Sequence, residues 1–216
     1  MIRPCSHRCL LMALMIMFVA SPALFSGAIV IDFEGLSDGT FVATEYPGLT
    51  FSNAIISTAG ISLNELEFPP ESGSNVVVDY GGAMSILFAL PVSSFGGFFT
   101  YLGPVTIQGF DSSHDLLASS TSQFSNNLAC LAGPPCLGDP GSSPDEFIQV
   151  NSSAGFSSVV ITGDPAGFSF ALDNVTYSLA STTSVPEPSS LVLLTGLLLF
   201  SIVWRTRVRQ CRSRSR

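Results

Sequence analysis

The sequence contains no lysine, and its arginines are confined to the two ends. Arg3 and Arg8 precede the first apolar run, and the other arginines lie between Arg205 and Arg216. All sixteen acidic residues lie between these two groups. A body with this charge repels nucleic acid and has no fixed cation for a phosphate group, which argues against nucleic-acid and nucleotide functions. Two interpretations of the acidity remain: cations as binding partners, or a surface charge that only keeps the domain soluble.

Side chains that commonly act in catalysis are scarce. Of the two histidines, only His114 lies beyond the N-terminal apolar run. Its Asp and Ser neighbours predict a hairpin turn at residues 111–115. Residues 35–39 match the Gly-x-Ser-x-Gly nucleophile pattern, but a β-like region follows where that motif needs a helix, so we interpret them as a turn. The sequence cannot place two carboxylates at the separation that glycoside hydrolysis needs. We therefore expect no enzymatic activity and no catalytic residue.

Five cysteines are present, and their positions separate them by compartment. Cys5 and Cys9 belong to a predicted signal peptide and Cys211 to a predicted cytoplasmic tail, so only Cys130 and Cys136 would meet an oxidising compartment. A Pro-Pro turn would bring these two together, which predicts a disulfide. Closing so small a loop would contribute at most about 2 kcal/mol. The spacing also suits a metal, although no second Cys or His pair accompanies it.

Helical periodicity is lacking, whereas Phe, Val, Ile and Thr are frequent and Gly and Pro recur every few residues. This composition predicts an all-β fold. Short β-like runs recur at intervals of about 8–12 residues, which predicts an antiparallel β-sandwich, with a jelly roll as the best fit. The runs are Ala28–Phe33, Leu49–Ser57, Asn75–Tyr80, Met84–Leu90, Phe95–Tyr101, Val105–Phe110, Asp115–Ser119, Glu146–Asn151, Ser157–Thr162 and Phe168–Tyr177.

Alternation within two runs predicts which side chains face the core. Alternate residues from Ile29 to Phe33 share one face of the first run. Phe168, Phe170 and Leu172 share one face of the last run. We therefore expect both sets to be buried. Between these runs, residues 120–145 are rich in Pro and Gly, which predicts a long loop.

The predicted organisation has five segments. A positively charged start, an apolar run and small residues at the cleavage position predict a signal peptide that is cleaved after Ala28, with Ala23 as the alternative site. The segments are a signal peptide at 1–28, a β-sandwich extracytoplasmic domain at 29–180, a linker with a Pro-Glu-Pro motif at 181–188, a transmembrane helix at 189–204 and a basic cytoplasmic tail at 205–216.

Three zones follow one another at the C-terminus: Pro186-Glu187-Pro188, an apolar segment at Leu191–Trp204 with Gly196 inside it, and the arginines. In this order they resemble the PEP-CTERM sorting signal of Gram-negative exopolysaccharide producers. The resemblance implies recognition by a membrane-embedded exosortase, processing at or near the Pro-Glu-Pro residues, and release of the body to the cell surface or extracellular matrix. A permanent single-pass membrane protein is the alternative.

The charge pattern of this tail independently predicts its orientation. Arginines that directly follow an apolar helix are retained on the cytoplasmic side, so the acidic domain is expected outside the membrane. As a helix, Leu191–Trp204 would be about 21 Å long, shorter than a hydrocarbon layer of about 30 Å. Such a short span suits a temporary anchor at least as well as a permanent one.

Residues 31–36, 105–111 and 170–177 of the body resemble, more weakly, strands of carbohydrate-binding-module-like jelly rolls. The resemblance implies a fold but does not settle a ligand. A carbohydrate-binding module for extracellular polysaccharide is therefore the alternative function, and it would require exposed tyrosine rings. The candidate rings are Tyr46, Tyr80, Tyr101 and Tyr177.

A calcium site is a further hypothesis. In jelly rolls of this type the first and last strands are neighbours, which would bring Asp32 or Glu34 close to Asp173. Backbone carbonyls could then complete a shell of oxygen ligands. Glu34 and Asp173 are the predicted metal ligands, and the alternative is that these carboxylates only face solvent.

Overall fold

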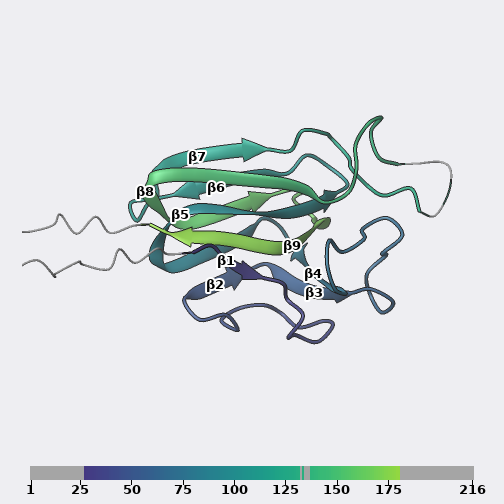
Figure 1. Cartoon of the computed structure of the whole chain (residues 1–216), viewed down its shortest axis with the longest axis horizontal. Coiled ribbons are helices and arrows are strands. Elements are labelled where there is room, and N and C mark those ends of the chain that lie inside the picture. Colours follow the sequence, from purple (N-terminus) through teal and green to yellow (C-terminus); the bar gives the residue numbers. More distant parts are fainter. Residues whose placement is uncertain (1–26, 132, 134–136, 181–216) are drawn as a thin grey trace, which may run out of the picture. The chain divides into compact units, whose positions relative to one another are not determined.

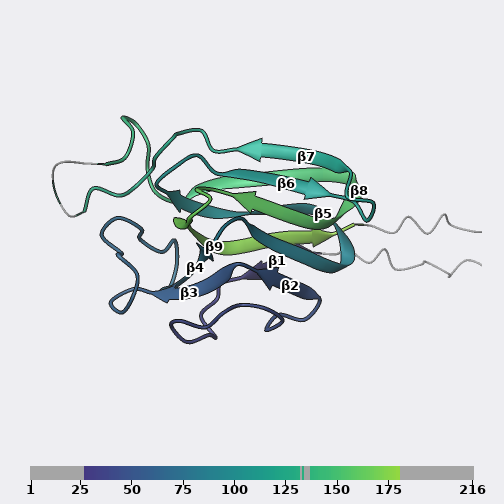
Figure 2. The ribbon, with the colours of Figure 1, turned by 180° about the vertical axis from the view of Figure 1, so that it is seen from behind.

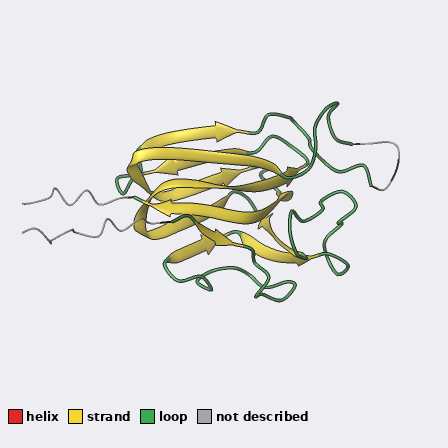
Figure 3. Cartoon of the chain, viewed as in Figure 1, coloured by secondary structure: helices red, strands yellow, loops and turns green. Residues whose placement is uncertain are grey.

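The computed structural model describes residues 27–131, 133 and 137–180. These residues form strands and loops and contain no helix (Figure 3). The strands are β1 (Ile29–Ile31), β2 (Leu49–Ser52), β3 (Ala54–Thr58), β4 (Asn75–Tyr80), β5 (Met84–Tyr101), β6 (Thr106–Phe110), β7 (Leu116–Thr121), β8 (Glu146–Thr162) and β9 (Gly167–Leu179). All pairs between them are antiparallel. The prediction of an all-β antiparallel fold is confirmed.

Two long strands, β5 and β8, take part in both layers of the fold (Figures 1 and 2). The first half of β5 pairs with β2, and its second half pairs with β9. The register between β5 and β8 shifts where β5 passes from Leu87 to Val92, next to Pro91. Strands that bend in this way form the corner between two packed sheets. One layer therefore contains β3, β4, β9 and the second half of β5, and the other contains β2, the first half of β5, β6 and β7.

The predicted runs coincide with strands, but the structure divides and joins them differently. Leu49–Ser57 is split into β2 and β3 at Asn53, whose φ of 57° interrupts the strand. Conversely, the fourth and fifth runs form the single strand β5, and the eighth and ninth form β8. Both strands continue through a register shift where the chain crosses from one layer to the other, and in β8 this shift lies beside Gly155, whose φ is 84°.

The core between the layers is rich in aromatic side chains. Phe33, Phe95, Phe99 and Phe156 are completely buried there. A second, smaller apolar cluster contains Val76 and Val78 of β4, Leu63 of the β3–β4 connection and Ala171 of β9. Because alternate β4 residues point to opposite faces, this second cluster lies on the outer face of the layer, beneath that connection.

The two alternation predictions are confirmed for Ile31, Phe33, Phe170 and Leu172, which are buried. Ile29 is exposed, so its predicted burial is wrong; it begins the first strand at the end of the domain. Phe168 is exposed, so its predicted burial is wrong.

The connections between the strands also agree with the predictions from the sequence. At 111–115 the Asp111 carboxylate accepts the N–H groups of Ser113 at 2.8 Å and Asp115 at 2.9 Å, so the hairpin prediction is confirmed. Between β7 and β8 the described residues form a long loop. Figures 1 and 2 show that this loop and the β3–β4 connection lie at the end of the domain opposite to the end of β9. Within 27–131, 133 and 137–180 there is no helix long and apolar enough to cross a membrane.

Candidate ligand-binding surface

Three aromatic side chains form an exposed cluster on the layer that contains β4 and β9. Phe41, Tyr80 and Phe168 are 58%, 42% and 60% exposed. Their rings pack edge to face: the centroids of Phe41 and Tyr80 are 5.1 Å apart, and those of Tyr80 and Phe168 are 5.3 Å apart. Aromatic rings gathered in this way on a surface are typical of a contact with a ligand or partner. These three residues are called the aromatic surface below.

The backbone at Phe168 explains why its side chain points outward. Its φ is 56°, and the preceding Gly167 has a φ of 82°. Two successive residues in the left-handed region break the strand alternation that would have placed Phe168 on the buried face with Phe170 and Leu172. Gly167 is required here, because a Cβ atom at this position would lie 2.5 Å from the backbone nitrogen of Gly81.

A buried carboxylate ties together the two strands that carry the aromatic surface. Asp79 is 0% exposed and accepts the N–H groups of Ser169 at 2.7 Å and Phe170 at 3.1 Å. It also accepts the Ser169 hydroxyl at 2.9 Å. Burial raises the pKa of the Asp79 carboxyl. Because Asp79 precedes Tyr80 and its partners follow Phe168, these bonds fix the spacing between two of the three rings.

A groove of about 320 Å³ adjoins the aromatic surface and shares Phe168 with it. Leu63 and Phe68 contribute apolar walls, and Asp38 and Ser62 contribute polar groups. The Ser62 hydroxyl donates to the Asp38 carboxylate at 2.5 Å. Among the residues that line this groove, Asp38 is the only one with a titratable side chain. An apolar groove with a few polar groups at fixed positions has the composition of a small-ligand site.

The four candidate tyrosines have different environments. Tyr101 and Tyr177 are buried, and Tyr46 is half-buried against the core beside Phe33. Only Tyr80 is exposed. Sequence analysis missed the two exposed phenylalanines beside it. For Phe168, the one available signal was the Gly-Asp-Pro-Ala-Gly turn that directly precedes it, because a glycine at the start of a strand can shift the alternation.

Glu34 and Asp173, the predicted calcium ligands, both bind the backbone of the β3–β4 connection. Glu34 accepts the N–H groups of Ser74 at 2.8 Å and Asn75 at 2.7 Å, and Asp173 accepts the N–H of Ser72 at 2.9 Å. The part of the chain that the structure describes has no group of three or more His, Cys, Asp or Glu side chains that could hold a metal ion. Both carboxylates anchor this connection, and calcium binding stays a prediction.

Replacing Glu34 with alanine is expected to lower the free energy of unfolding by about 1 kcal/mol, because two backbone N–H groups lose their acceptor. If anchoring is the whole role of Glu34, this loss is the same with and without millimolar calcium. Thermal melts of the wild type and of Glu34→Ala in both conditions measure it. A calcium-dependent rise in Tm that the wild type shows, and that Glu34→Ala and Asp173→Ala lose, would instead support the calcium site.

Two carboxyl groups near the same connection have raised pKa values. The pKa of Asp173 is raised to about 6, chiefly by burial. The N–H groups of Ser72 and Asn174 oppose this rise, and the neighbouring charges of Glu71 and Asp145 contribute to it. Burial also raises the pKa of Asp145 to about 6, with Glu71 adding to the effect. The Thr100 hydroxyl donates to Asp145 at 3.2 Å and partly offsets this rise. The folded domain therefore holds protons that the unfolded chain releases at lower pH.

These shifts predict that Asp173 makes the fold less stable as the pH rises. Its folded-state pKa of about 6 lies above the unfolded value of about 3.9, so its stabilising protonation is complete below about pH 4 and is lost as the pH passes about 6. The loss for Asp173 is about 2–3 kcal/mol. In urea unfolding at pH 5 and pH 8, the wild type should lose more stability between the two conditions than Asp173→Asn. The exposed control Asp115→Asn should behave as the wild type, and equal losses in all three proteins would contradict the assignment.

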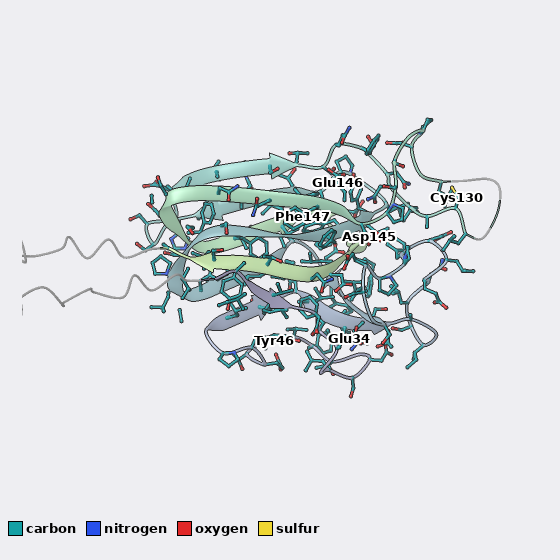
Figure 4. All side chains as sticks on the ribbon, viewed as in Figure 1. Glu34, Tyr46, Cys130, Asp145, Glu146 and Phe147 are labelled. Carbon is teal, nitrogen blue, oxygen red and sulfur yellow. The ribbon has the colours of Figure 1, made fainter. Side chains whose placement is uncertain are left out.

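The remaining predicted residues lie partly or wholly outside the described part of the chain. Cys130 is disulfide-bonded, and Figure 4 shows it in the long loop away from the strands. Cys136 lies outside the described residues, so the predicted Cys130–Cys136 pair stays a prediction. Residues 1–26 of the predicted signal peptide, the C-terminal apolar segment and Pro186-Glu187-Pro188 also lie outside them.

Three solved structures are among those that match this chain. A DUF4465 family protein from Bacteroides caccae is 11% identical, with a TM-score of 0.43 and coverage of 70% of this chain and 99% of that chain. The K1 cleaved adhesin domain of Lys-gingipain from Porphyromonas gingivalis is 10% identical, with a TM-score of 0.40 and coverage of 70% and 97%. A family 6 carbohydrate-binding module is 12% identical, with a TM-score of 0.35 and coverage of 70% and 93%. Sequence identities and TM-scores this low do not indicate a ligand for this chain.

No curated protein matches the sequence. A family model does match its C-terminal part: the PEP-CTERM protein-sorting motif matches residues 184–208. The match includes the Pro-Glu-Pro residues, the apolar segment and the first arginines. The chain therefore carries a PEP-CTERM protein-sorting motif directly after an all-β antiparallel domain.

Proposed function

We propose that this protein is an exosortase substrate whose acidic β domain is exported, held at the cytoplasmic membrane by its C-terminal tail and then delivered to the cell surface or extracellular matrix. The observation that carries the proposal is the PEP-CTERM motif at 184–208, which begins a few residues after β9 ends at Leu179. The arginines support the orientation, because they favour a cytoplasmic C-terminus. The exported domain contains none of the arginines that would oppose its translocation.

The proposal is tested by measuring whether the C-terminus is removed from the mature protein. In a host that carries an exosortase, mass measurement of the mature protein should show that the arginine-rich end has been removed. In the same host without its exosortase, the full-length chain should remain in the membrane fraction. An intact C-terminus in both hosts would favour a permanent single-pass anchor.

The delivered domain is proposed to be a jelly roll without enzymatic activity. The passage of β5 and β8 between two layers supports the jelly-roll topology. The absence of an activity is supported by the position of His114, which lies in the β6–β7 hairpin and not in the groove. In that groove, Asp38 has no second titratable group with which to form a general acid–base pair.

Carbohydrate binding at the aromatic surface is the second candidate function. The specific observation in its favour is the contact between three exposed rings beside a groove that offers the Asp38 carboxylate and the Ser62 hydroxyl. Apolar faces of sugar rings stack on aromatic side chains, while their hydroxyl groups need hydrogen-bonding partners. Because the exported domain has no lysine or arginine, the proposed ligand is a neutral glycan and not an anionic one.

Phe168→Ala is expected to weaken the binding of a neutral oligosaccharide about tenfold or more. The reason is that an aromatic side chain that contributes ~1.4 kcal/mol or more to a contact is truncated. A glycan array would select the oligosaccharide, and isothermal titration would measure its Kd. The fold should persist, because Phe168 is exposed.

Phe147→Ala is the matched control, because Phe147 is also an exposed phenylalanine but belongs to β8 and packs against Phe98. It should bind like the wild type. Equal losses in both variants, or binding confined to uronic-acid glycans, would contradict the assignment of the aromatic surface.

A further inference from the structure

Both ends of the β domain emerge at the same end of the fold. β9 finishes at Leu179, and β1 begins at Ile29, which pairs with Tyr177 near the end of β9. The bend of β5 is at this end too, because Val92 pairs with Leu179. The long loops lie at the opposite end (Figures 1 and 2).

The end where β9 finishes exposes aliphatic side chains. A groove of about 190 Å³ is lined there by Ile29, Pro47, Leu90 and Leu179, together with other apolar residues. Leu87 adjoins it, since it lines a neighbouring groove that shares Pro47. Leu87 and Leu90 are more than half exposed. These five residues are called the apolar end surface.

Acidic residues are a feature of the other end of the domain, where the long loops lie. The end opposite to the end of β9 carries Glu65, Glu67 and Glu71 of the β3–β4 connection and Asp145 of the long loop (Figures 1 and 2). Acidic residues also occur nearer the apolar end surface, at Glu45 and in the 111–115 hairpin. An anionic lipid surface would therefore repel the loop end most strongly and favour an orientation with the apolar end surface toward the bilayer.

The length of the tail restricts how far this end can move from a membrane. Residues 180–190 separate the last strand from the apolar segment that begins at Leu191. Fully extended, they reach about 40 Å. A tether of this length holds the apolar end surface near the bilayer at a high effective concentration, so that a contact too weak to hold a free protein is still populated.

We propose that, before the tail is processed, the apolar end surface contacts the headgroup region of the outer leaflet of the cytoplasmic membrane. This inference rests on the membrane anchoring in the proposed function. A second copy of the chain is less suited than the membrane to cover this surface, because two acidic domains repel each other and no tether holds one to the other. The contact would present Pro186-Glu187-Pro188 at the membrane surface and direct the loops and the groove beside Phe168 away from it.

The test uses the full chain in liposomes of phosphatidylcholine that contain two photoactivatable lipids, one with the reactive group in the headgroup and one with it in the acyl chain. After illumination, mass spectrometry should find lipid adducts on the segment that contains Leu87 and Leu90, as well as on Leu191–Trp204. Serine at both Leu87 and Leu90 should lower labelling of that segment about fivefold or more. Ile61→Ser, which changes an exposed aliphatic residue in the β3–β4 connection, should have no effect.

The outcomes separate this inference from the proposed function. Adducts on Leu191–Trp204 without adducts near Leu90 would overturn the inference and leave membrane anchoring standing. No adducts on Leu191–Trp204 would overturn both. Lipid-independent cross-links between the apolar end surfaces of two copies would overturn the inference in favour of a dimer. Circular dichroism of the double serine variant establishes that a loss of labelling does not come from unfolding.

Discussion

Replacement of Pro186, Glu187 and Pro188 with alanine is expected to trap the full-length chain in the cytoplasmic membrane. Export should continue, because the predicted signal peptide is unchanged, and membrane insertion should continue, because the apolar segment and the arginines are unchanged. The processed fraction should fall about tenfold or more, the factor that corresponds to ~1.4 kcal/mol or more of lost recognition energy. Fractionation and mass measurement of the C-terminus, in a host with an exosortase, would detect the change.

The physical basis of this result is the chemistry of the motif. Proline fixes φ, lacks an N–H and disfavours helix in the residue before it, so the segment is expected to stay extended between the last strand and the apolar segment. Glu187 places one charge between the two prolines. Alanine removes both properties and favours helix.

A matched variant separates recognition from anchoring. Serine in place of the arginines from Arg205 to Arg216 should disturb retention and orientation first, because the proposed orientation depends on arginines that favour the cytoplasmic side. The two phenotypes should therefore differ. A triple-alanine variant that is processed and reaches the surface like the wild type would remove the support for exosortase sorting.

Asp79→Ala is expected to destabilise the β domain by about 3 kcal/mol or more, because each buried donor left without an acceptor costs about 1–3 kcal/mol. Three buried donors, two from Ser169 and one from Phe170, would lose their acceptor. Urea unfolding monitored by circular dichroism measures the loss. Neutral-glycan binding at the aromatic surface should weaken in parallel, because Asp79 holds Tyr80 and Phe168 at their spacing.

Two further variants test whether the loss of stability comes from removing the Asp79 carboxylate. Asp79→Asn should cost less than half as much, because it keeps one acceptor and removes a charge whose burial is unfavourable, as the raised pKa of Asp79 indicates. Asp164→Ala removes an acceptor for the N–H of Ala166 in an exposed turn and should cost about 1 kcal/mol or less. Similar losses in Asp79→Ala and Asp164→Ala would show that Asp79 does not anchor β9.

The accuracy of the strand predictions has a simple physical reason. Val, Ile and Phe in runs of a few residues are favoured in strands, and the separators Gly and Asp-Ser favour turns whatever the surrounding fold. The hairpin at 111–115 is such a case, because its hydrogen bonds join Asp111 to residues two and four positions away. Local chemistry of this kind can be predicted without knowing which strands pair.

The predictions for Phe168 and for the calcium ligands depended on more than local chemistry. Alternation predicted a buried Phe168, but Gly167 and Phe168 both have a positive φ, which turns the Phe168 side chain to the exposed face. Proximity of the first and last strands was also anticipated, and β1 does pair with β9. What the sequence could not show is that Glu34 and Asp173 each bind N–H groups of the β3–β4 connection.

The sequence by itself determined the all-β antiparallel class and the sorting motif, because both depend on residue type and order along the chain. Tertiary structure alone decided which residues meet: that Phe41, Tyr80 and Phe168 form one surface, and that Asp79 accepts bonds from residues 90 positions away. It also decided that Ile29, Leu90 and Leu179 share one end of the domain. The physical reason is that pairing between distant strands is set by the packing of both layers at once, and no short segment carries that information.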